Sequence, residues 1–207
     1  MSTHTKPELA APNEEAFNLV STHLDNVAPA LAALQQQAGH LAAWGEELAH
    51  RLLAGARLLT AGNGGSAAEA QHLSAELVGR FRDERRPFSA IALHTDTSAV
   101  TAIGNDYGYE LVFARQVTGH ARPGDILLLM STSGNSKNLL LAAEAAERAH
   151  AQTWALTGRA PNPLTMAVQD YIAIDAPPAN VQEAHLIALH AICQCFDAAV
   201  AREEGKP

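Results

Sequence analysis

The sequence predicts an α/β fold with three layers, in which helices cover both faces of a parallel sheet of five strands. From Arg57 onward, short apolar runs alternate with segments of helical periodicity. A helix between two successive strands makes the connection a right-handed crossover, which joins the strands in parallel. The chain has 207 residues, of which 47% are hydrophobic, which is enough for one core but not for two. We therefore expect a single αβα domain.

The segment that precedes these runs is expected to be helical. Between Glu14 and Gly55, apolar residues such as Phe17 and Leu24 recur at helical spacing. Pro29 is expected to start or kink the second helix of this segment. Residues 1–13 are rich in Pro, Thr and Glu, so we expect a mobile N-terminal tail there and a single domain over residues 14–207.

Five apolar runs are expected to form buried strands: 57–62 (RLLTAG), 88–94 (FSAIALH), 125–132 (DILLLMST), 152–158 (QTWALTG) and 171–177 (YIAIDAP). Helices are expected at 67–78, 98–103, 109–120, 136–151 and 181–203. In a parallel sheet of this kind, ligands bind at the carboxyl ends of the strands. A site is therefore expected in the turns that follow the strands.

The charge balance argues against a nucleic-acid-binding protein. The net charge is −8 and the pI is about 5.6, whereas affinity for a phosphate backbone requires a surplus of lysine and arginine. The cluster of basic residues within 80–86 alternates with acidic residues, which is typical of a solvated loop: Arg80, Arg82, Asp83, Glu84, Arg85 and Arg86. We expect no nucleic-acid partner.

The sequence also argues against a membrane-bound or exported protein. No run reaches the ~20 apolar residues that a membrane helix requires, and the opening MSTHTKPELAAPNEE lacks the hydrophobic core of a signal peptide. We therefore expect a cytoplasmic protein without a membrane partner. Cys193 and Cys195 are two residues apart in a predicted helix, where their side chains diverge, so core thiols are expected rather than a disulfide or a zinc site.

The first Gly-rich turn, residues 60–66 (TAGNGGS), leads from a predicted strand into a predicted helix. Its glycines permit a tight turn and leave backbone N–H groups exposed to an anion. No Gly-Lys-Ser or Gly-Lys-Thr follows, so this is not the phosphate loop of nucleotide hydrolases. Two interpretations stay open: an anion site, or glycines that only turn the chain sharply.

A second turn, residues 131–136, carries four hydroxyls after a very apolar strand: Ser131, Thr132, Ser133 and Ser136. Ser136 is positioned to cap the next helix, and a helix N-terminus attracts anions. Since capping requires only one hydroxyl, the other three indicate a phosphate site. Lys137 either adds charge to this site or points to solvent.

Two groups of polar side chains lie on predicted helices. His72 and Glu76 are four residues apart, so they share one helix face and are able to meet one ligand. The last helix adds four more polar residues in a stretch otherwise suited to the core, where such groups require partners: Gln182, Glu183, His185 and His190. A single histidine of this kind is usually a satisfied core residue, but two histidines beside an amide and a carboxylate favour a functional site.

Five motifs in order resemble the phosphoheptose isomerases of the sugar isomerase (SIS) domain family. They are 62–81 (GNGGSAAEAQHLSAELVGRF), 101–110 (TAIGNDYGYE), 131–136 (STSGNS), 155–158 (ALTG) and 181–190 (VQEAHLIALH). The resemblance covers residues 14–203 and implies the flavodoxin-like SIS fold. It also implies an intramolecular oxidoreductase, assembled as a homotetramer, that converts sedoheptulose 7-phosphate to D-glycero-D-manno-heptose 7-phosphate.

The resemblance nominates site residues at the matching positions. It implies a zinc ion held by His72, Glu76, Gln182 and His190. It implies a phosphate cradle formed by Ser131, Thr132, Ser133 and Ser136. It implies contacts to the substrate from Glu76 and Gln182 and from the positions Asn63, Gly64, Gly65, Asn105 and Asp106, with Ser66 as a neighbour.

An aldose–ketose interconversion moves a proton between adjacent carbons through an enediol and needs one base and one acid. By resemblance, Glu76 takes the carbon proton and His190 protonates oxygen or carries the proton onward. A zinc ion would polarise the carbonyl and stabilise the enediolate. Since one side chain cannot bind metal and exchange protons at once, we treat the two roles as overlapping states, with metal bound in only some of them.

The spacing of two nominated ligands predicts a shared site. Gln182 and His190 are about 12 Å apart along a helix and about 80° apart around it, so one ion barely bridges them. This spacing and the tetrameric habit of the family predict a site at a subunit interface, to which another copy contributes.

Two departures from the family pattern bear on the choice of sugar. Many relatives carry an acidic residue where this chain has Ala179 and Asn180, and the loop after Gly158 is short and rich in proline. Two alternatives therefore stay open: an isomerase of another ketose phosphate, such as one in a natural-product pathway, and a noncatalytic scaffold resembling the replication-initiator-binding proteins of this fold. The scaffold proteins tend to lose the acid–base residues that this chain keeps. Whether Glu183 or His185 takes part in the acid–base chemistry is also open.

Overall fold

A computed structural model describes residues 11–205, so most of the expected tail, residues 1–10, lies outside the described residues. The N-terminal segment is helical, as predicted, and forms α1 (Glu14–Asp25), α2 (Val27–Gln35) and α3 (Ala38–Leu53). Pro29 lies in the first turn of α2, where the missing N–H of proline costs no helical hydrogen bond. The break between α2 and α3 has no Gly or Pro to signal it.

The sheet is parallel and five-stranded, as predicted, with the strand order β2-β1-β3-β4-β5. Its strands are β1 (Leu58–Gly62), β2 (Ala90–Ala92), β3 (Ile126–Ser131), β4 (Gln152–Thr157) and β5 (Asp170–Ala173). β1 and β3 are buried along their whole length, but the edge strands β2 and β5 are short and partly exposed. The expectation of five buried strands is therefore wrong for the two edges, because an edge strand has only one neighbour to cover it.

The remaining elements follow the predicted alternation with three differences. They are α4 (Gly65–Val78), α5 (Thr97–Tyr107), the 3-10 turn η1 (Tyr109–Leu111), α6 (Val112–His120), α7 (Lys137–Arg148), α8 (Pro163–Ala167) and α9 (Pro178–Glu203). α5, with 11 residues, is five residues longer than the expected helix 98–103, and η1 separates from the helix that follows it. The short α8 begins at a capping box in which Asn162 and Thr165 bond to each other's backbone.

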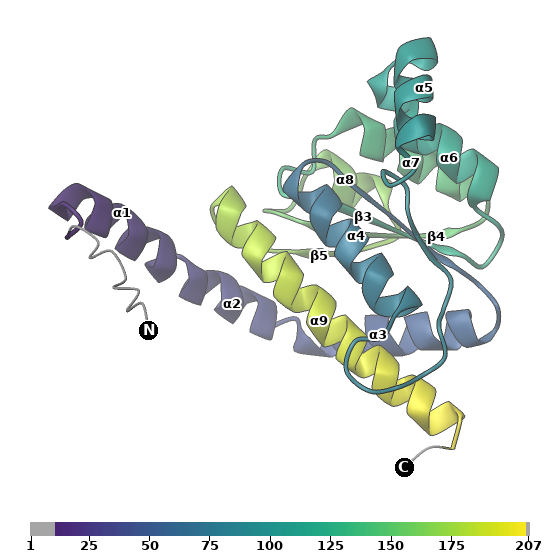
Figure 1. Cartoon of the computed structure of the whole chain (residues 1–207), viewed down its shortest axis with the longest axis horizontal. Helices are drawn as coiled ribbons and strands as arrows, with labels where there is room; N and C mark the ends of the chain where they lie inside the picture. The colour runs from purple at the N-terminus through teal and green to yellow at the C-terminus, as the bar shows by residue number, and fades with distance from the viewer. Residues whose placement is uncertain (1–10, 206–207) are drawn as a thin grey trace, which may run out of the picture.

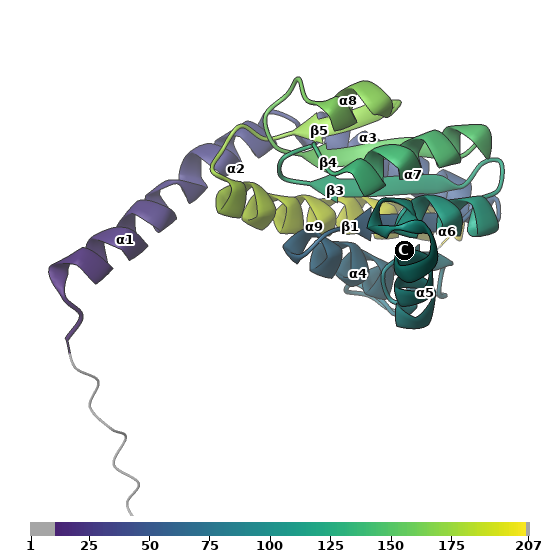
Figure 2. The same ribbon diagram turned by 90° about the horizontal axis from the view of Figure 1, so that it is seen from above.

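Helices cover the sheet on both faces, which gives the predicted three layers (Figures 1 and 2). On one face, α3, α4 and α9 bury Leu58 and Leu128; on the other, α6, α7 and α8 bury Leu59 and Leu129. Successive strand residues point to opposite faces, so adjacent leucines serve different cores. The aliphatic runs noted in the sequence therefore reflect a sheet buried on both sides.

The order of the strands places two turns beside each other. β1 and β3 are neighbours, yet the chain leaves β1 for α4 on one face and leaves β3 for α7 on the other. Such a reversal opens a crevice at the carboxyl ends of the two strands, where α/β folds of this strand order bind ligands. The turns at 63–66 and 131–136, which the sequence singled out, flank this crevice.

Helix α1 projects from the body of the molecule (Figure 2). None of its residues is buried in the described part of the chain, and Phe17 and Leu24 are 62% and 61% exposed. Where α1 approaches α9, His23 Nε2 lies 2.7 Å from Glu183 Oε1. The apolar periodicity of this helix therefore faces solvent in the single chain.

One described helix, α9, is long and apolar enough to cross a membrane by length and composition alone, which corrects the expectation that no run would qualify. Half of its apolar window is buried inside the fold, against α2, α3 and α4. The core helix of a soluble protein passes the same test, so this is weak evidence for a membrane span. Cys193 and Cys195 on α9 are free, as predicted, although Cys195 is only partly buried.

Candidate active site

The turn after β1 brings α4 and α9 into close contact. Gly64 has φ +56° and ψ −123°, a conformation that glycine adopts most readily, and Gly65 begins α4. A Cβ placed on Gly65 would lie 1.6 Å from Gln182 Nε2, so a side chain there would displace the amide of Gln182. Ser66, the neighbouring candidate, is buried. The second glycine of the motif thus makes room for a predicted site residue.

Asn63 is held by two partners that the sequence did not indicate. Asn63 and Asn138 pair through both amides, at 3.0 and 2.9 Å, and Tyr109 Oη donates to Asn63 Oδ1 at 3.1 Å. Asn138 is only 4% exposed and lies in the first turn of α7. The amide at the end of β1 is therefore fixed by the element that follows β3, which joins the two sides of the crevice.

The turn after β3 is closed by its own hydroxyls and by one glycine with a positive φ. Ser131 Oγ accepts a hydrogen bond from Gly134 N at 3.1 Å, and Ser133 Oγ accepts one from Asn135 N at 3.3 Å. Gly134 has φ +65°, and a Cβ on it would lie 2.1 Å from Asn162 Oδ1. The fold therefore requires glycine at this point, and it leaves Thr132 half-buried beside the turn.

The N-terminus of α7 is suited to an anion. Ser136 occupies the N-cap position, as predicted, but within the described residues its hydroxyl makes no capping bond. This hydroxyl and the first N–H groups of the helix thus stay free for a ligand, at the positive end of the helix dipole. Lys137 Nζ instead pairs with Glu110 Oε2 at 2.7 Å on the surface, which favours the solvent-facing alternative.

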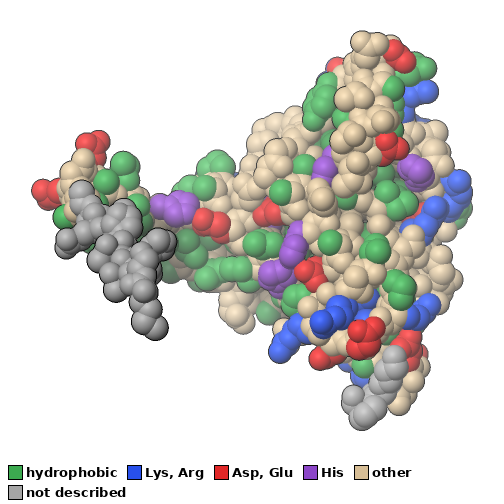
Figure 3. All heavy atoms as spheres, in the orientation of Figure 1, with side chains coloured by type: hydrophobic (Ala, Val, Ile, Leu, Met, Phe, Trp, Pro, Cys, Tyr) green, Lys and Arg blue, Asp and Glu red, His purple; other side chains and the backbone are tan. Residues whose placement is uncertain are grey.

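Three predicted residues meet where α4 packs against α9. His72 Nε2 lies 2.9 Å from His190 Nε2 and 3.2 Å from Glu76 Oε1. The cluster is partly exposed: the side chains of His72 and Glu76 are 39% and 17% accessible. Figure 3 shows histidine and acidic side chains together on this face, over α4 and α9. His72 and Glu76 thus form one group with access to solvent together with His190, which lies 118 positions after His72 in the sequence.

The donors of this cluster fit a metal ion such as zinc. Their ligand atoms all lie within 4.8 Å of one another. Nitrogen and oxygen donors around a tetrahedral zinc ion are separated by about 3.3 Å, close to the two distances above. Cys193 is nearby, but burial, together with the carboxylates of Glu76 and Asp197, raises the pKa of its thiol to about 12. Without a metal ion, this thiol therefore keeps its proton at neutral pH.

The other predicted residues lie away from this cluster in the single chain. Gln182 packs against Gly65, and about 10 Å of helix rise separates Gly65 from His72. Asn105 and Asp106 lie at the end of α5, where they are exposed and bond to each other at 2.8 Å. No described contact joins Asn105 or Asp106 to the two turns or to the three-residue cluster.

A buried acid–histidine pair, Glu69 and His185, continues the line of polar residues between α4 and α9. His185 is fully buried and its Nε2 lies 3.3 Å from the Thr157 carbonyl, so Nε2 donates and Nδ1 is left as an acceptor. Glu69 Oε2 faces Nδ1 at 3.9 Å, and neither atom has a hydrogen-bond partner among the described residues. Glu69 was missed, although it lies one turn before His72 on the same helix face.

Both members of this pair are shifted toward their neutral forms. Burial raises the pKa of Glu69 to about 7 and lowers the pKa of His185 to about 4. Around neutral pH, an uncharged imidazole therefore faces a carboxyl group that readily keeps its proton. Glu183, the other open candidate, is instead exposed and bonds to His23 and Asn180.

Replacing Glu69 by glutamine should stabilise the protein at high pH. Between the usual pKa of 4.5 and a folded value of about 7, the unfolded chain loses the Glu69 proton while the folded chain keeps it. Stability is thus lost as the pH rises through this window. We expect Glu69→Gln to raise the free energy of unfolding at pH 8 by about 2–3 kcal/mol, with little change at pH 4.5, measured by urea unfolding with chelator present.

A control variant, Glu144→Gln, removes a carboxylate that is 58% exposed on α7 and should change stability little at either pH. Equal destabilisation by Glu69→Gln at both pH values would show that the Glu69 carboxyl is charged in the folded protein, contrary to this account.

Comparisons with known proteins agree with the fold and the motifs. Residues 22–158 match the model of the SIS domain family. The chain is 59% identical over 183 residues to a phosphoheptose isomerase of Streptomyces coelicolor, which covers 88% of this chain and 79% of the relative. It is 44% identical over 172 residues to a phosphoheptose isomerase of Akkermansia muciniphila, and this match covers 83% of this chain and 91% of the relative. The solved structure of a phosphoheptose isomerase from Neisseria gonorrhoeae superimposes with a TM-score of 0.82 at 37% identity. This match covers 88% of this chain and 99% of the solved one.

Proposed function

This chain belongs to the SIS domain family and, within it, to the phosphoheptose isomerases, and from that premise we propose that it converts sedoheptulose 7-phosphate to D-glycero-D-manno-heptose 7-phosphate. It is a sugar-phosphate isomerase by family. The observation that carries the proposal is the cluster that His72 and Glu76, on the helix that starts at the Gly-rich turn, form with His190 of α9. About 10 Å of α4 separates Gly65 from His72, which suits an extended sugar chain lying along the helix.

Glu76 is the proposed base. Its carboxylate takes the proton from C1 of the ketose, and the electron pair of that bond forms the C1=C2 bond of an enediol while the carbonyl oxygen accepts a proton. His190 is the proposed acid that supplies this oxygen proton. In the second half of the reaction, O1 loses its proton as the carbonyl forms at C1, and C2 receives a proton, so that the atoms balance. Each positioned acid or base contributes a factor of about 10²–10⁴ to the rate.

His72, Glu76 and His190 would hold the zinc ion that the family implies, with Gln182 as a further candidate ligand. A bound zinc ion supplies positive charge that polarises the carbonyl and stabilises an enediolate. Since Glu76 and His190 have both ligand and proton-transfer roles, we propose that these are overlapping states of one cluster. His72 is then the member with no proton to transfer, and its close contact with both partners holds them together.

The phosphate group is proposed to bind at the turn after β3, among Ser131, Thr132, Ser133 and Ser136. The free hydroxyl of Ser136 and the N-terminus of α7 support this placement. Asn63, Gly64, Gly65 and Ser66 would contact the sugar from the opposite side of the crevice. Asn63 is oriented for this by Asn138 and Tyr109, whose donors occupy its carbonyl oxygen.

A direct assay tests the proposed reaction. Purified protein is incubated with sedoheptulose 7-phosphate, with zinc or with a chelator, and the aldose is followed by NMR. We expect the aldose to form and its rate to respond to zinc. Turnover of a different ketose phosphate alone would favour the second candidate, an isomerase of another sugar, and no turnover of any ketose phosphate would favour a noncatalytic scaffold.

We propose that the working form is a homotetramer in the cytoplasm with sites at subunit interfaces. The exposed apolar residues of α1 support a partner copy. So does an apolar groove of about 450 Å³ beside α2, α3 and α9, which Leu31, Leu34 and Ile187 help to line. Because Glu76 and His190 already meet in one chain, the residues that another copy would supply are Gln182, Asn105 and Asp106, which lie apart from the cluster.

Mixed oligomers test this sharing of the site. Protomers carrying Glu76→Gln are coexpressed with protomers carrying Asp106→Asn, and the hybrids are isolated by two affinity tags. We expect activity in the hybrids, because an intact Glu76 on one chain is combined with an intact Asp106 from the other. Hybrids of Glu76→Gln with His190→Ala are the control and should stay inactive. Inactive Glu76→Gln/Asp106→Asn hybrids would argue that Asp106 serves only its own chain.

A further inference from the structure

Arg85 departs from the solvated loop that the sequence predicts. It lies between α4 and β2, yet its side chain is only 5% exposed. Its Nε donates to Asp197 Oδ1 at 2.7 Å, and the guanidinium is 5.5 and 5.3 Å from the ring centres of Phe88 and Phe196. Burying a charge is costly unless it is paired and hydrogen-bonded, so this arginine has a specific task.

The guanidinium of Arg85 also donates hydrogen bonds to the backbone at the end of α4. Nη2 donates to the carbonyl oxygen of Glu76 at 2.7 Å, and Nη1 donates to that of Leu77 at 3.0 Å. The last carbonyls of a helix have no partner within the helix, and a cation at that end also opposes the helix dipole. Arg85 therefore closes the last turn of α4, which is the turn that carries the proposed base.

Arg85 also ties this turn to the helix that carries the proposed acid. Asp197 lies seven residues, or two turns, after His190 on α9, so the two side chains lie on the same helix face. The guanidinium thus bridges the backbone of Glu76 on α4 and the carboxylate of Asp197 on α9. In addition, the loop that Arg85 anchors places the Phe81 ring 5.4 Å from the His190 ring.

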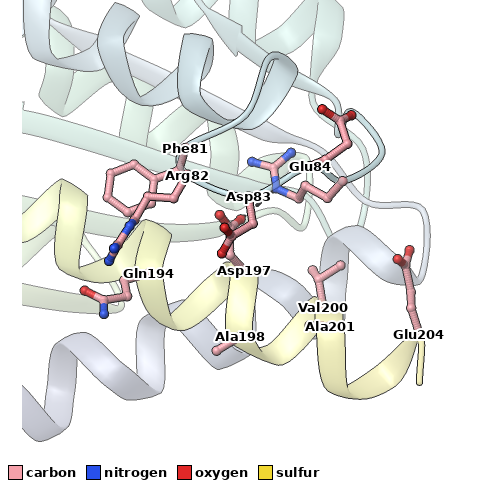
Figure 4. A pocket seen from close by; sticks show the side chains of 11 residues that line it. Phe81, Arg82, Asp83, Glu84, Gln194, Asp197, Ala198, Val200, Ala201 and Glu204 are labelled. Atoms are coloured by element: carbon pink, nitrogen blue, oxygen red, sulfur yellow. Dashed lines mark hydrogen bonds and ion pairs between the residues drawn. The ribbon is translucent and has the colours of Figure 1, made fainter. Parts of the chain in front are cut away.

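Elsewhere the loop is loosely packed. A cavity of about 420 Å³ lies between residues 81–85 and the second half of α9. Figure 4 shows Phe81, Asp83 and Glu84 on one side of this cavity and Asp197 and Ala198 on the other. The buried pair of Arg85 and Asp197 attaches the loop to α9, together with the ring contact of Phe81 with His190 and the exposed ion pair of Arg86 with Glu204 at the end of that helix.

We propose that Arg85 is a positioning residue for the isomerase reaction: paired with Asp197, it fixes the last turn of α4 and the 79–88 loop so that Glu76 stays against His190. This inference rests on the proposed function. Arg85 does not touch the reacting atoms; it acts through the backbone of Glu76 and through the contact between Phe81 and His190.

The test compares Arg85→Lys and Asp197→Asn with Arg82→Lys, which changes an exposed arginine of the same loop. A displaced base costs about 10²-fold in rate, so Arg85→Lys should lower kcat by about that factor and Asp197→Asn by less. KM should stay nearly unchanged, because the phosphate turn follows β3. The ring proton signals of His190 in the NMR spectrum should shift in both variants, since the Phe81 ring moves. Arg82→Lys should change neither kcat nor these signals.

A rescue experiment separates a missing cation from a disturbed fold. Arg85→Ala opens the site toward the cavity, so millimolar guanidinium should restore part of kcat, whereas neutral urea should not. Two results would overturn the inference. In the first, the folded Asp197→Asn and Arg85→Lys proteins keep the kcat and the His190 signals of Arg82→Lys. In the second, only their KM changes. The His190 signals do not depend on turnover, so an inactive wild-type protein would refute the proposed function without deciding this inference.

Discussion

Glu76→Gln should lower kcat for sedoheptulose 7-phosphate by about 10³-fold while KM changes little. The amide has the size of the carboxylate but cannot take a proton from carbon. Glu76 lies 3.2 Å from His72, with 17% of its side chain exposed, so a substrate carbon has access to it. Steady-state rates with zinc at saturation are the measurement, because glutamine is also a poorer metal ligand.

The control for this experiment is a carboxylate on a different helix. Glu144 on α7 pairs with Arg148 at the surface, and Glu144→Gln should keep full activity. If Glu76→Gln retained wild-type kcat, another group would be the base. Glu69 would then be the first candidate, since its carboxyl lies two turns earlier on the same helix.

Gly134→Ala should lower kcat/KM by about 10²-fold, mostly through KM. The φ of Gly134 is +65°, and the new methyl group would lie 2.1 Å from Asn162 Oδ1, so the turn after β3 has to open. Two hydrogen bonds to a charged phosphate, each worth about 1.5–3 kcal/mol, are enough to account for such a loss. Binding of inorganic phosphate, measured by calorimetry, should weaken in parallel.

A second change in the same place distinguishes this clash from a general loss of stability. Asn162→Ala removes the group that the methyl would meet, so the double variant should recover part of the phosphate affinity. Asn162 also caps α8, and its loss costs about 1 kcal/mol of stability. Gly55→Ala, at φ +95° with open space around it, is the control for backbone strain alone. Unchanged phosphate binding in Gly134→Ala would place the phosphate elsewhere.

The fold could be predicted because its signals are local. Aliphatic runs such as 126–130 and the helices between them dictate a parallel sheet with two covered faces, and this is the observed architecture. Element ends were less predictable. α8 depends on the reciprocal capping of Asn162 and Thr165, and the break at Gln36 and Gln37 has no turn-forming residue.

The site residues that belong to sequence motifs could be predicted, but those whose role depends on tertiary contacts could not. His72 and Glu76 share a helix face by spacing, and the resemblance added His190. Arg85, in contrast, stands among charged residues that indicate a solvated loop, and only the approach of α9 shows that it is buried. Asn138 likewise belongs to no motif in the sequence, and only the structure shows that its amide bonds to that of Asn63.

Solvent isotope incorporation reports directly on proton transfer between adjacent carbons by Glu76. The protein converts sedoheptulose 7-phosphate in D₂O, and the aldose is analysed by NMR for deuterium at C2. Proton transfer by Glu76 predicts deuterium at C2 in at least part of the product, and it predicts that both the deuterium and the turnover are lost in Glu76→Gln. A product that carries no solvent deuterium at C2 at any time, or exchange that persists unchanged in Glu76→Gln, would contradict it.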